Sequence, residues 1–302
     1  MKQPCKLALD EEKFIKGILQ ILPASLKRKF YASITRMGAR WGLRIHPSVW
    51  RLPFGLLLKM SRSNSDEGVP DVEGAALQFL DTSIRGVNFP RLVDRVQGTA
   101  GRSFILSTYV SGIDGCDAVD LFSEDDWARL EGDLHDQLKS LQRQTCSSNH
   151  KICNAAGGII DDPRIVRVAE QNIDITSTEN FWRQVWSGLD FPRNRDTIRP
   201  RIEPLMQRAV PIVFCHGDLF LRNFIFPGGL DEWRAGRSRI CLVDWEFAGW
   251  MPAPWDALKS TFVECESSDS PWIQTVKRIL PNYDEYLDAD WLWRSKSGVT
   301  MV

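Results

Sequence analysis

The chain has 302 residues, of which 43% are hydrophobic and 25% are charged, and this composition excludes a disordered or collagen-like protein. Its formal net charge of -1 excludes a global field that would recruit nucleic acid or an acidic membrane. The length allows either one barrel-like domain or two lobes. Seven scattered cysteines without a CxxC pair favour reduced thiols. We expect a cytoplasmic protein, because no apolar run reaches the ~20 residues of a transmembrane helix.

The N-terminal segment, residues 1–45, is predicted to be a helical extension that is interrupted at Pro23, Gly38 and Gly42. Residues 13–44 carry eight basic side chains among apolar ones. A basic amphipathic helix is one kind of membrane-surface element. The interruptions favour the other interpretation, an ordinary helix with a solvated basic face.

A β-rich N-terminal lobe is predicted over residues 46–110. Its first strand lies within an apolar stretch, residues 49–60, and a helical pattern over residues 72–80 follows a polar loop. The turn-forming residues 97–101 separate two further strands, which suits an antiparallel hairpin. These two strands are expected over residues 89–96 and 103–110.

A mostly helical C-terminal lobe is predicted over residues 111–302. Ser123 and Asp126 form a capping-box pattern, and leucines at helical spacing follow them, so a long helix begins here. A second helix is expected to start near Ser177 or Thr178, and a shorter one to cover residues 202–209.

Two acidic loops follow short predicted strands in this lobe. One strand, residues 210–215, leads into His216-Gly217-Asp218, and the next strand begins after Asn223. Another strand, residues 239–243, leads directly into Asp244. Phosphoryl transfer requires a carboxylate that accepts the proton of the acceptor, oxygen ligands for Mg²⁺ and a cation on the phosphates. The two loops supply the first two of these.

The sequence HGDLFLRN at residues 216–223 resembles the HGDxxxxN catalytic loop of the aminoglycoside phosphotransferase and choline kinase superfamily. LVDWEFAGW at residues 242–250 resembles the metal-binding segment of that family. The residues of both segments are most similar to those of fungal members. The resemblance implies an α+β, two-lobed protein-kinase-like fold with a β-rich N-lobe and a mostly helical C-lobe. It also implies a kinase that moves the γ-phosphoryl group of ATP to a small-molecule hydroxyl acceptor with Mg²⁺.

The same resemblance assigns roles to individual residues. It makes Asp218 the catalytic base and His216 a residue that shapes the loop, while Asn223 and Asp244 become ligands of Mg²⁺. Glu246 is either an outer metal ligand or a structural acid. Asp256 is similar to the structural acid that opens a helix in this family.

The N-lobe adds a candidate nucleotide site. Lys59 ends a strand and Glu73 opens the following helix, which is similar to the kinase pair that holds the α and β phosphates. Taken singly, both could be solvated surface residues; beside the two acidic loops the functional interpretation is favoured. Residues 107–110 resemble the interlobe hinge, so Ser107 and Tyr109 are expected to meet the adenine.

Two alternatives stay open at this point, and a third is excluded. No GxGxxG motif precedes the lysine strand, which allows a nucleotide-binding pseudokinase that acts as a scaffold. A zinc site of His216, Asp218 and Asp244 is a weaker alternative, because oxygen ligands suit Mg²⁺ better. A protein kinase is excluded by the missing HRD and APE motifs. The expected partners are a nucleotide and a small hydroxyl compound, with no nucleic acid.

Aromatic residues near the C-terminus are interleaved with acids, a mixture that could hold a cationic alcohol. Packing of the last helices is the favoured alternative. The residues concerned are Trp272, Tyr283, Tyr286, Trp291 and Trp293.

Overall fold

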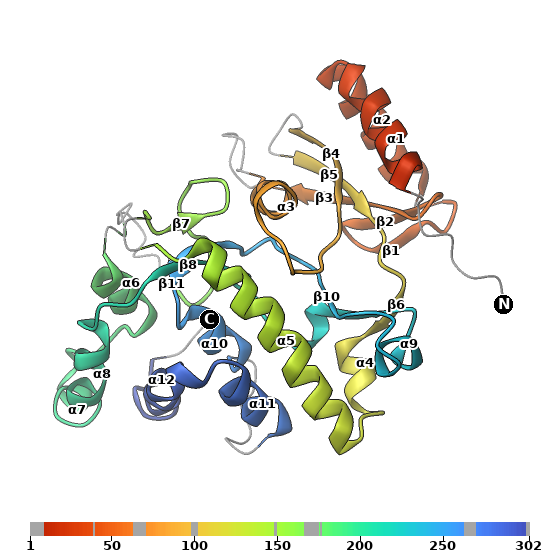
Figure 1. The fold of residues 1–302 in the computed structure, drawn as a ribbon. Coiled ribbons are helices and arrows are strands. Elements are labelled where there is room, and N and C mark those ends of the chain that lie inside the picture. Colours follow the sequence, from red (N-terminus) through yellow and green to blue (C-terminus); the bar gives the residue numbers. More distant parts are fainter. Residues whose placement is uncertain are drawn as a thin grey trace.

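A five-stranded antiparallel sheet with its helices forms one end of the molecule, and a mostly helical part forms the other (Figure 1). This is the two-lobed, protein-kinase-like α+β architecture that the sequence predicts. No helix of the part that the computed structural model describes is long and apolar enough to cross a membrane. The described residues are 9–38, 40–62, 71–97, 102–147, 150–165, 175, 177–262 and 270–299.

The five-stranded sheet has the order β1-β2-β3-β5-β4. A three-residue turn joins β2 to β3, and its residues Phe54 and Gly55 have φ values of 61° and 64°. Glycine accepts this left-handed conformation without steric cost. The elements of this end are α1 (Leu9–Ile21), α2 (Ala24–Gly38), β1 (Arg44–His46), β2 (Val49–Leu52), β3 (Leu56–Arg62), α3 (Val72–Ser83), β4 (Leu92–Gln97) and β5 (Arg102–Thr108).

Helices α1 and α2 cover one face of this sheet, and Pro23 separates them. Leu19 and Tyr31 pack there with Trp50 and other apolar side chains of β2, β3 and β5. The Tyr31 hydroxyl donates a hydrogen bond to Asp94 at 2.7 Å. The packing explains why an N-terminal extension that the sequence breaks at a proline still folds onto the lobe.

Helix α3 covers the opposite face. Asp71 caps it by accepting a hydrogen bond from the Gly74 amide at 2.9 Å, and its buried Ala76 and Leu80 share a core with Ile105 of β5. Ile105 is paired with Lys59, the central residue of β3, so their side chains lie on the same face of the sheet. Helix α3 therefore faces the side chains of β3 that point away from α1 and α2.

The C-terminal part is built around α5, which carries the predicted capping box at Ser123 and Asp126. Large aromatic side chains fill the surrounding core, including seven buried tryptophans: Trp182, Trp186, Trp233, Trp245, Trp255, Trp272 and Trp293. The helices are α4 (Gly115–Val119), α5 (Glu124–Thr145), α6 (Thr178–Val185), α7 (Pro192–Arg195), α8 (Arg199–Met206), η1 (Leu221–Asn223), α9 (Leu230–Arg234), α10 (Trp255–Ser260), α11 (Pro271–Ile279), η2 (Pro281–Tyr283) and α12 (Asp284–Lys296).

Two three-stranded sheets, β10-β9-β6 and β7-β11-β8, carry the acidic loops. Their strands are β6 (Gly112–Asp114), β7 (Cys153–Asn154), β8 (Ile212–Cys215), β9 (Phe224–Pro227), β10 (Cys241–Leu242) and β11 (Gly249–Pro252). The chain leaves the large sheet after Thr108, and β6 then pairs with β9. The lobe boundary near residue 110 remains a prediction.

Several predicted boundaries differ from the structure, and two of the differences have a visible cause. Helix α8 begins at Arg199 rather than at residue 202, because Pro200 occupies its first turn, where a missing N–H is tolerated. The strand predicted over residues 239–243 is reduced to β10, because the Ile240 amide donates to Asp133 instead of to a strand.

Candidate active site

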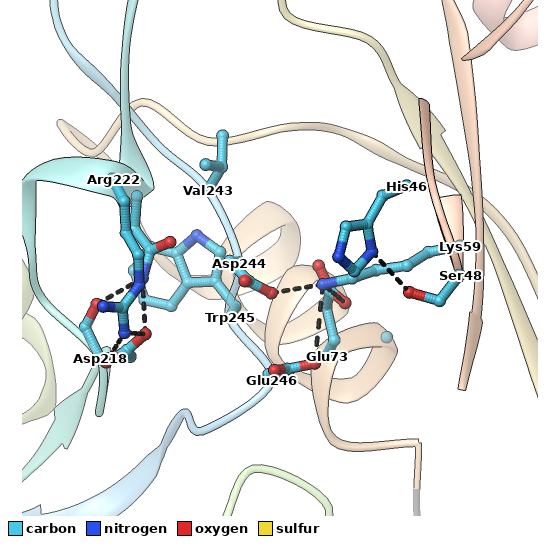
Figure 2. A network of polar contacts seen from close by, with 12 residues as sticks. His46, Ser48, Lys59, Glu73, Asp218, Arg222, Val243, Asp244, Trp245 and Glu246 are labelled. Carbon is cyan, nitrogen blue, oxygen red and sulfur yellow. Dashed lines mark hydrogen bonds and ion pairs between the residues drawn. The ribbon is translucent and has the colours of Figure 1, made fainter. Parts of the chain in front are cut away.

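The sequence predicts that Lys59 ends a strand over residues 52–59, and this is wrong: a turn at residues 53–55 divides that stretch, and Lys59 lies in the middle of β3. Its side chain points to the face that α3 covers. Its neighbours Leu58 and Met60 are buried on the other face, as strand alternation requires. The Lys59 Nζ lies 2.8 Å from Oε2 of Glu73, which belongs to the first turn of α3. The ion pair expected from the sequence is therefore present, and both side chains are mostly buried (Figure 2).

The same ammonium group is shared with two further carboxylates. It donates to Oδ1 of Asp244 and lies 3.7 Å from Oε2 of Glu246. Burial alone would lower the pKa of Lys59, but the attraction of the three carboxylates outweighs it and raises the pKa. Burial, opposed by Lys59 and assisted by Asp244, raises the pKa of Glu73 to about 7. One cation thus faces three acids, and the cluster has an excess of negative charge.

The backbone holds Asp244 in an unusual conformation. Its φ is 65°, a left-handed value that costs a residue other than glycine about 1–3 kcal/mol. The flanking residues fix this geometry: the Val243 amide donates to the Asn223 carbonyl at 2.9 Å, and the buried indole of Trp245 donates to Leu242. The sharp turn after β10 thereby directs the carboxylate toward Lys59.

His216 supports the neighbouring loop. Its ring is fully buried; Nδ1 accepts the Asp218 amide at 3.2 Å, which leaves Nε2 to donate to the Val243 carbonyl at 2.9 Å. Asp256 accepts the backbone amides of His216 and Gly217 at 3.1 and 2.9 Å. Burial is the main reason that the pKa of His216 is lowered. Because both ring nitrogens are engaged, the alternative zinc site is wrong.

Asp218 receives hydrogen bonds from two residues of its own loop. Asn223 Nδ2 donates to Oδ2 at 2.8 Å and to the Asp218 carbonyl at 2.7 Å. Arg222 Nη2 donates to both carboxylate oxygens, at 3.0 and 2.8 Å. Burial would raise the pKa of Asp218, but Arg222 and Asn223 outweigh it and lower the pKa. The contact of Arg222 was not identified from the sequence; its position four residues after Asp218 was the available signal.

The acidic cluster around Lys59 and the pair of Asp218 with Arg222 lie next to each other. Figure 2 shows Asp244 between Lys59 and the Asp218–Arg222 pair, with Trp245 behind it. Electrostatic coupling is consistent with this arrangement, because the charge of Asp218 contributes to raising the pKa of Glu246. The structure thus gathers residues from β3, α3, the loop after β8 and the segment after β10.

The donor set fits Mg²⁺. Glu73, Asp244 and Glu246 each offer one carboxylate oxygen, and these oxygens lie within 4.8 Å of one another. Oxygen ligands are those that Mg²⁺ prefers, and a divalent cation would compensate the excess negative charge. Asn223 adds an amide oxygen in the adjacent loop. Glu246 therefore lies among the candidate ligands rather than apart from them.

The sequence model of the phosphotransferase enzyme family matches residues 27–288. The chain belongs to this family. Ethanolamine kinase 2 of Mus musculus is 38% identical over 48 residues, which are 16% of this chain and 11% of that relative. The GDP and kanamycin complex of APH(2")-IIia covers 88% of this chain and 90% of its own, with a TM-score of 0.50 and 15% identity. A thermostable mutant of aminoglycoside phosphotransferase APH(4)-Ia covers 83% and 91%, with a TM-score of 0.44 and 11% identity.

The turn between β1 and β2, which precedes the lysine strand, contains no glycine. This chain has His46-Pro47-Ser48 there, and His46 Nδ1 lies 3.2 Å from the Ser48 hydroxyl. The register pairs His46 with Val49 and Val49 with Lys59, so the three side chains share one face of the sheet. Figure 2 shows the imidazole beside Lys59.

The expected hinge comprises the last residues of β5 and those that follow it. Ser107 is buried, and the Tyr109 amide donates to the Gly55 carbonyl at 2.7 Å. The Arg51 guanidinium lies 4.3 Å from the centre of the Tyr109 ring. A base bound here would therefore use backbone groups other than the Tyr109 amide.

Three of the five aromatic residues of the predicted acceptor pocket belong to the core instead. Trp272, Tyr286 and Trp293 are buried, and their polar atoms donate to carbonyls of Ser260, Leu205 and Ser187. These rings pack the last helices, as the alternative interpretation held. Trp272 also contacts Phe220 and Phe224, so it supports the loop that carries Asp218.

Proposed function

We propose that this phosphotransferase is a small-molecule kinase that moves the γ-phosphoryl group of ATP to a hydroxyl acceptor with Mg²⁺. The observation that supports it most is the cluster in which Lys59 contacts both Glu73 and Asp244, next to the loop of Asp218 and Asn223. A buried cation, hard oxygen ligands and a carboxylate base are the groups that phosphoryl transfer requires. The lobe boundary near residue 110 would place the nucleotide between the two lobes.

Asp218 is the proposed base. It would orient the acceptor hydroxyl and accept its proton as the oxygen attacks the phosphorus atom. Arg222 now binds both oxygens of this carboxylate, and its side chain is 48% exposed. The guanidinium must therefore turn away when the hydroxyl arrives. Its positive charge would then be available to the transferring phosphoryl group.

Lys59 would bind the α and β phosphates, and Glu73 would keep the ammonium group in position. Asn223 and Asp244, with Glu246 beside them, would hold Mg²⁺. When bound, Mg²⁺ neutralises charge on the β and γ phosphates. Ser107 and Tyr109 would frame the adenine at the hinge.

The turn between β1 and β2 would contact the phosphates through side chains rather than glycine amides. His46 and Ser48 are the polar side chains of this turn, and His46 shares the sheet face of Lys59. A pseudokinase scaffold is the second candidate, because this turn has no glycine. The filled positions of Lys59, Asp218 and Asp244 count against it.

Consumption of ATP and of GTP, each with Mg²⁺ and a panel of hydroxyl compounds, tests the proposal. Both nucleotides are included because APH(2")-IIia is described in complex with GDP. Acceptor-dependent turnover is the expected result. Thermal stabilisation by Mg²⁺-nucleotide without turnover on any acceptor would favour the scaffold.

A further inference from the structure

The N-terminal part of the chain has a charge distribution unlike that of the whole. Residues 13–65 contain eleven lysines and arginines and no aspartate or glutamate, although the net charge of the chain is -1. A segment of this kind creates a local positive potential that the overall charge conceals. This potential attracts an anionic surface.

Exposed apolar side chains gather in the same segment. Among the described residues, twelve large apolar side chains are exposed, and eight of them lie within residues 14–45. Ile21 is 84% exposed, Phe14 69% and Trp41 66%. The full set is Phe14, Ile18, Ile21, Leu26, Phe30, Met37, Trp41 and Ile45. Scattered exposed apolar residues need no explanation, but a concentration of this kind marks an interaction surface.

The exposed residues of α1 form a row. Phe14, Ile18 and Ile21 are spaced by four and three residues, which places them on one side of the helix. The buried Leu19 of the same helix faces the sheet. The row therefore points away from the core.

Helix α2 repeats the arrangement with positive charges beside the row. Leu26, Phe30 and Met37 share its outer side, and the exposed Lys29 and Arg36 form a parallel basic row. The buried Tyr31 faces the sheet. We call the exposed apolar residues of α1 and α2, together with Lys13, Lys29 and Arg36, the outer helical face. Figure 1 shows both helices at the end of the molecule farthest from α7 and α12.

Within the described residues, two lysines beside this face are paired with acids, whereas the basic side chains of the face are not; Arg36 donates to the Ala32 carbonyl of its own helix. Lys16 pairs with Glu12 at 2.9 Å and Lys27 with Asp94 at 2.6 Å. Lys13, Lys29 and Arg36 form no ion pair with any acid that the structure describes. Positive charge is thus left to solvent beside apolar rows, which is the pattern of helices that lie in a lipid interface.

We propose that the outer helical face binds the surface of an anionic lipid bilayer. The apolar rows would enter the boundary between headgroups and acyl chains, and the basic side chains would contact the lipid phosphates. An anionic bilayer fits better than a second copy of the chain, because two copies would bring these basic rows together. Lys59 points to the opposite face of the sheet, so its cluster with Glu73 and Asp244 would face away from the bilayer.

Co-sedimentation of the full chain with vesicles tests the proposal. We expect binding to phosphatidylcholine vesicles that contain phosphatidylserine, weak binding to pure phosphatidylcholine, and a loss of binding as salt is added. Lys29→Ser with Arg36→Ser should lower the partition coefficient about 30-fold at low salt. Phe14→Ser with Phe30→Ser should also lower the partition coefficient, although Lys29 and Arg36 keep their charges. Electrostatic attraction alone does not predict this loss.

Matched controls lie outside the face. Lys139→Ser with Arg201→Ser removes two exposed basic residues, and Leu121→Ser with Ile159→Ser removes two exposed apolar ones. Both should bind like the parent, and thermal unfolding verifies that each variant is folded. Equal binding of parent and Lys29/Arg36 variant, or no binding to anionic vesicles at low salt, would overturn the proposal. So would light scattering that shows a dimer dispersed by Phe14→Ser with Phe30→Ser.

Discussion

Replacing Lys59 by methionine removes the one cation of the acidic cluster while keeping a side chain of similar length. The carboxylates of Asp244 and Glu246, whose oxygens lie within 4.8 Å of each other, would then lack a counter-charge. Glu73 would take up a proton instead, because burial already raises its pKa to about 7 in the presence of Lys59. At an effective dielectric constant of about 20, two charges at this separation repel by about 3.5 kcal/mol. Asp244 and Glu246 are 36% and 49% exposed, and solvent reduces the effect. We expect a loss of about 2–3 kcal/mol in unfolding free energy.

Denaturation with and without Mg²⁺ measures this effect. Such a loss corresponds to a fall of about 3–5 °C in Tm for a chain of this length. Mg²⁺ should stabilise Lys59→Met more than the parent, because the ion supplies the missing positive charge. Lys27→Met is the matched control: it also removes a mostly buried lysine of the same lobe, but Lys27 pairs with Asp94 alone. Equal Mg²⁺ shifts in parent, Lys59→Met and Lys27→Met would refute the reasoning.

The remaining predictions concern the loops and one helix cap. Asp218→Asn should lower kcat about 10²- to 10⁴-fold and leave nucleotide affinity nearly unchanged in a steady-state assay, because only the base is lost. Asp244→Asn should instead weaken Mg²⁺-nucleotide binding in a titration, and excess Mg²⁺ should partly relieve the defect; full affinity at low Mg²⁺ would contradict its role as a ligand. Hydrogen bonds from Arg234 and Ser123 lower the pKa of Asp126, so its carboxylate stabilises the fold above the unfolded pKa. Asp126→Asn should therefore have a lower free energy of unfolding than the parent at pH 7, and this difference should shrink as the pH falls below about 4. Denaturant curves at several pH values measure it.

Local signals predict much of the site. The β-branched run before His216 and the short strand after Asn223 frame the first loop, and both appear as β8 and β9. Strand alternation and the helix start at Asp71 bring Lys59 to Glu73, although the two lie far from Asp244 in sequence. These features depend on residues within one or two elements, where sequence patterns are most informative.

Other features depend on long-range packing, which the sequence does not predict. The left-handed conformation of Asp244 is imposed by Trp245 and the adjacent strand, and the residue type alone does not predict it. The outward rows of α1 and α2 become visible only once Leu19 and Tyr31 are seen to face the sheet. The place of His46 beside Lys59 follows from the register of β1, β2 and β3, which no short sequence motif specifies.

The fate of the γ-phosphoryl group tests the central claim most directly. ATP labelled in that group would be incubated with Mg²⁺ and a mixture of hydroxyl compounds, and the products separated by mass spectrometry. The account predicts a labelled phosphate monoester of one acceptor with the parent chain and its near absence with Asp218→Asn. Equal labelling of that ester by parent and Asp218→Asn, or label that stays in ATP or appears only as inorganic phosphate, would contradict it.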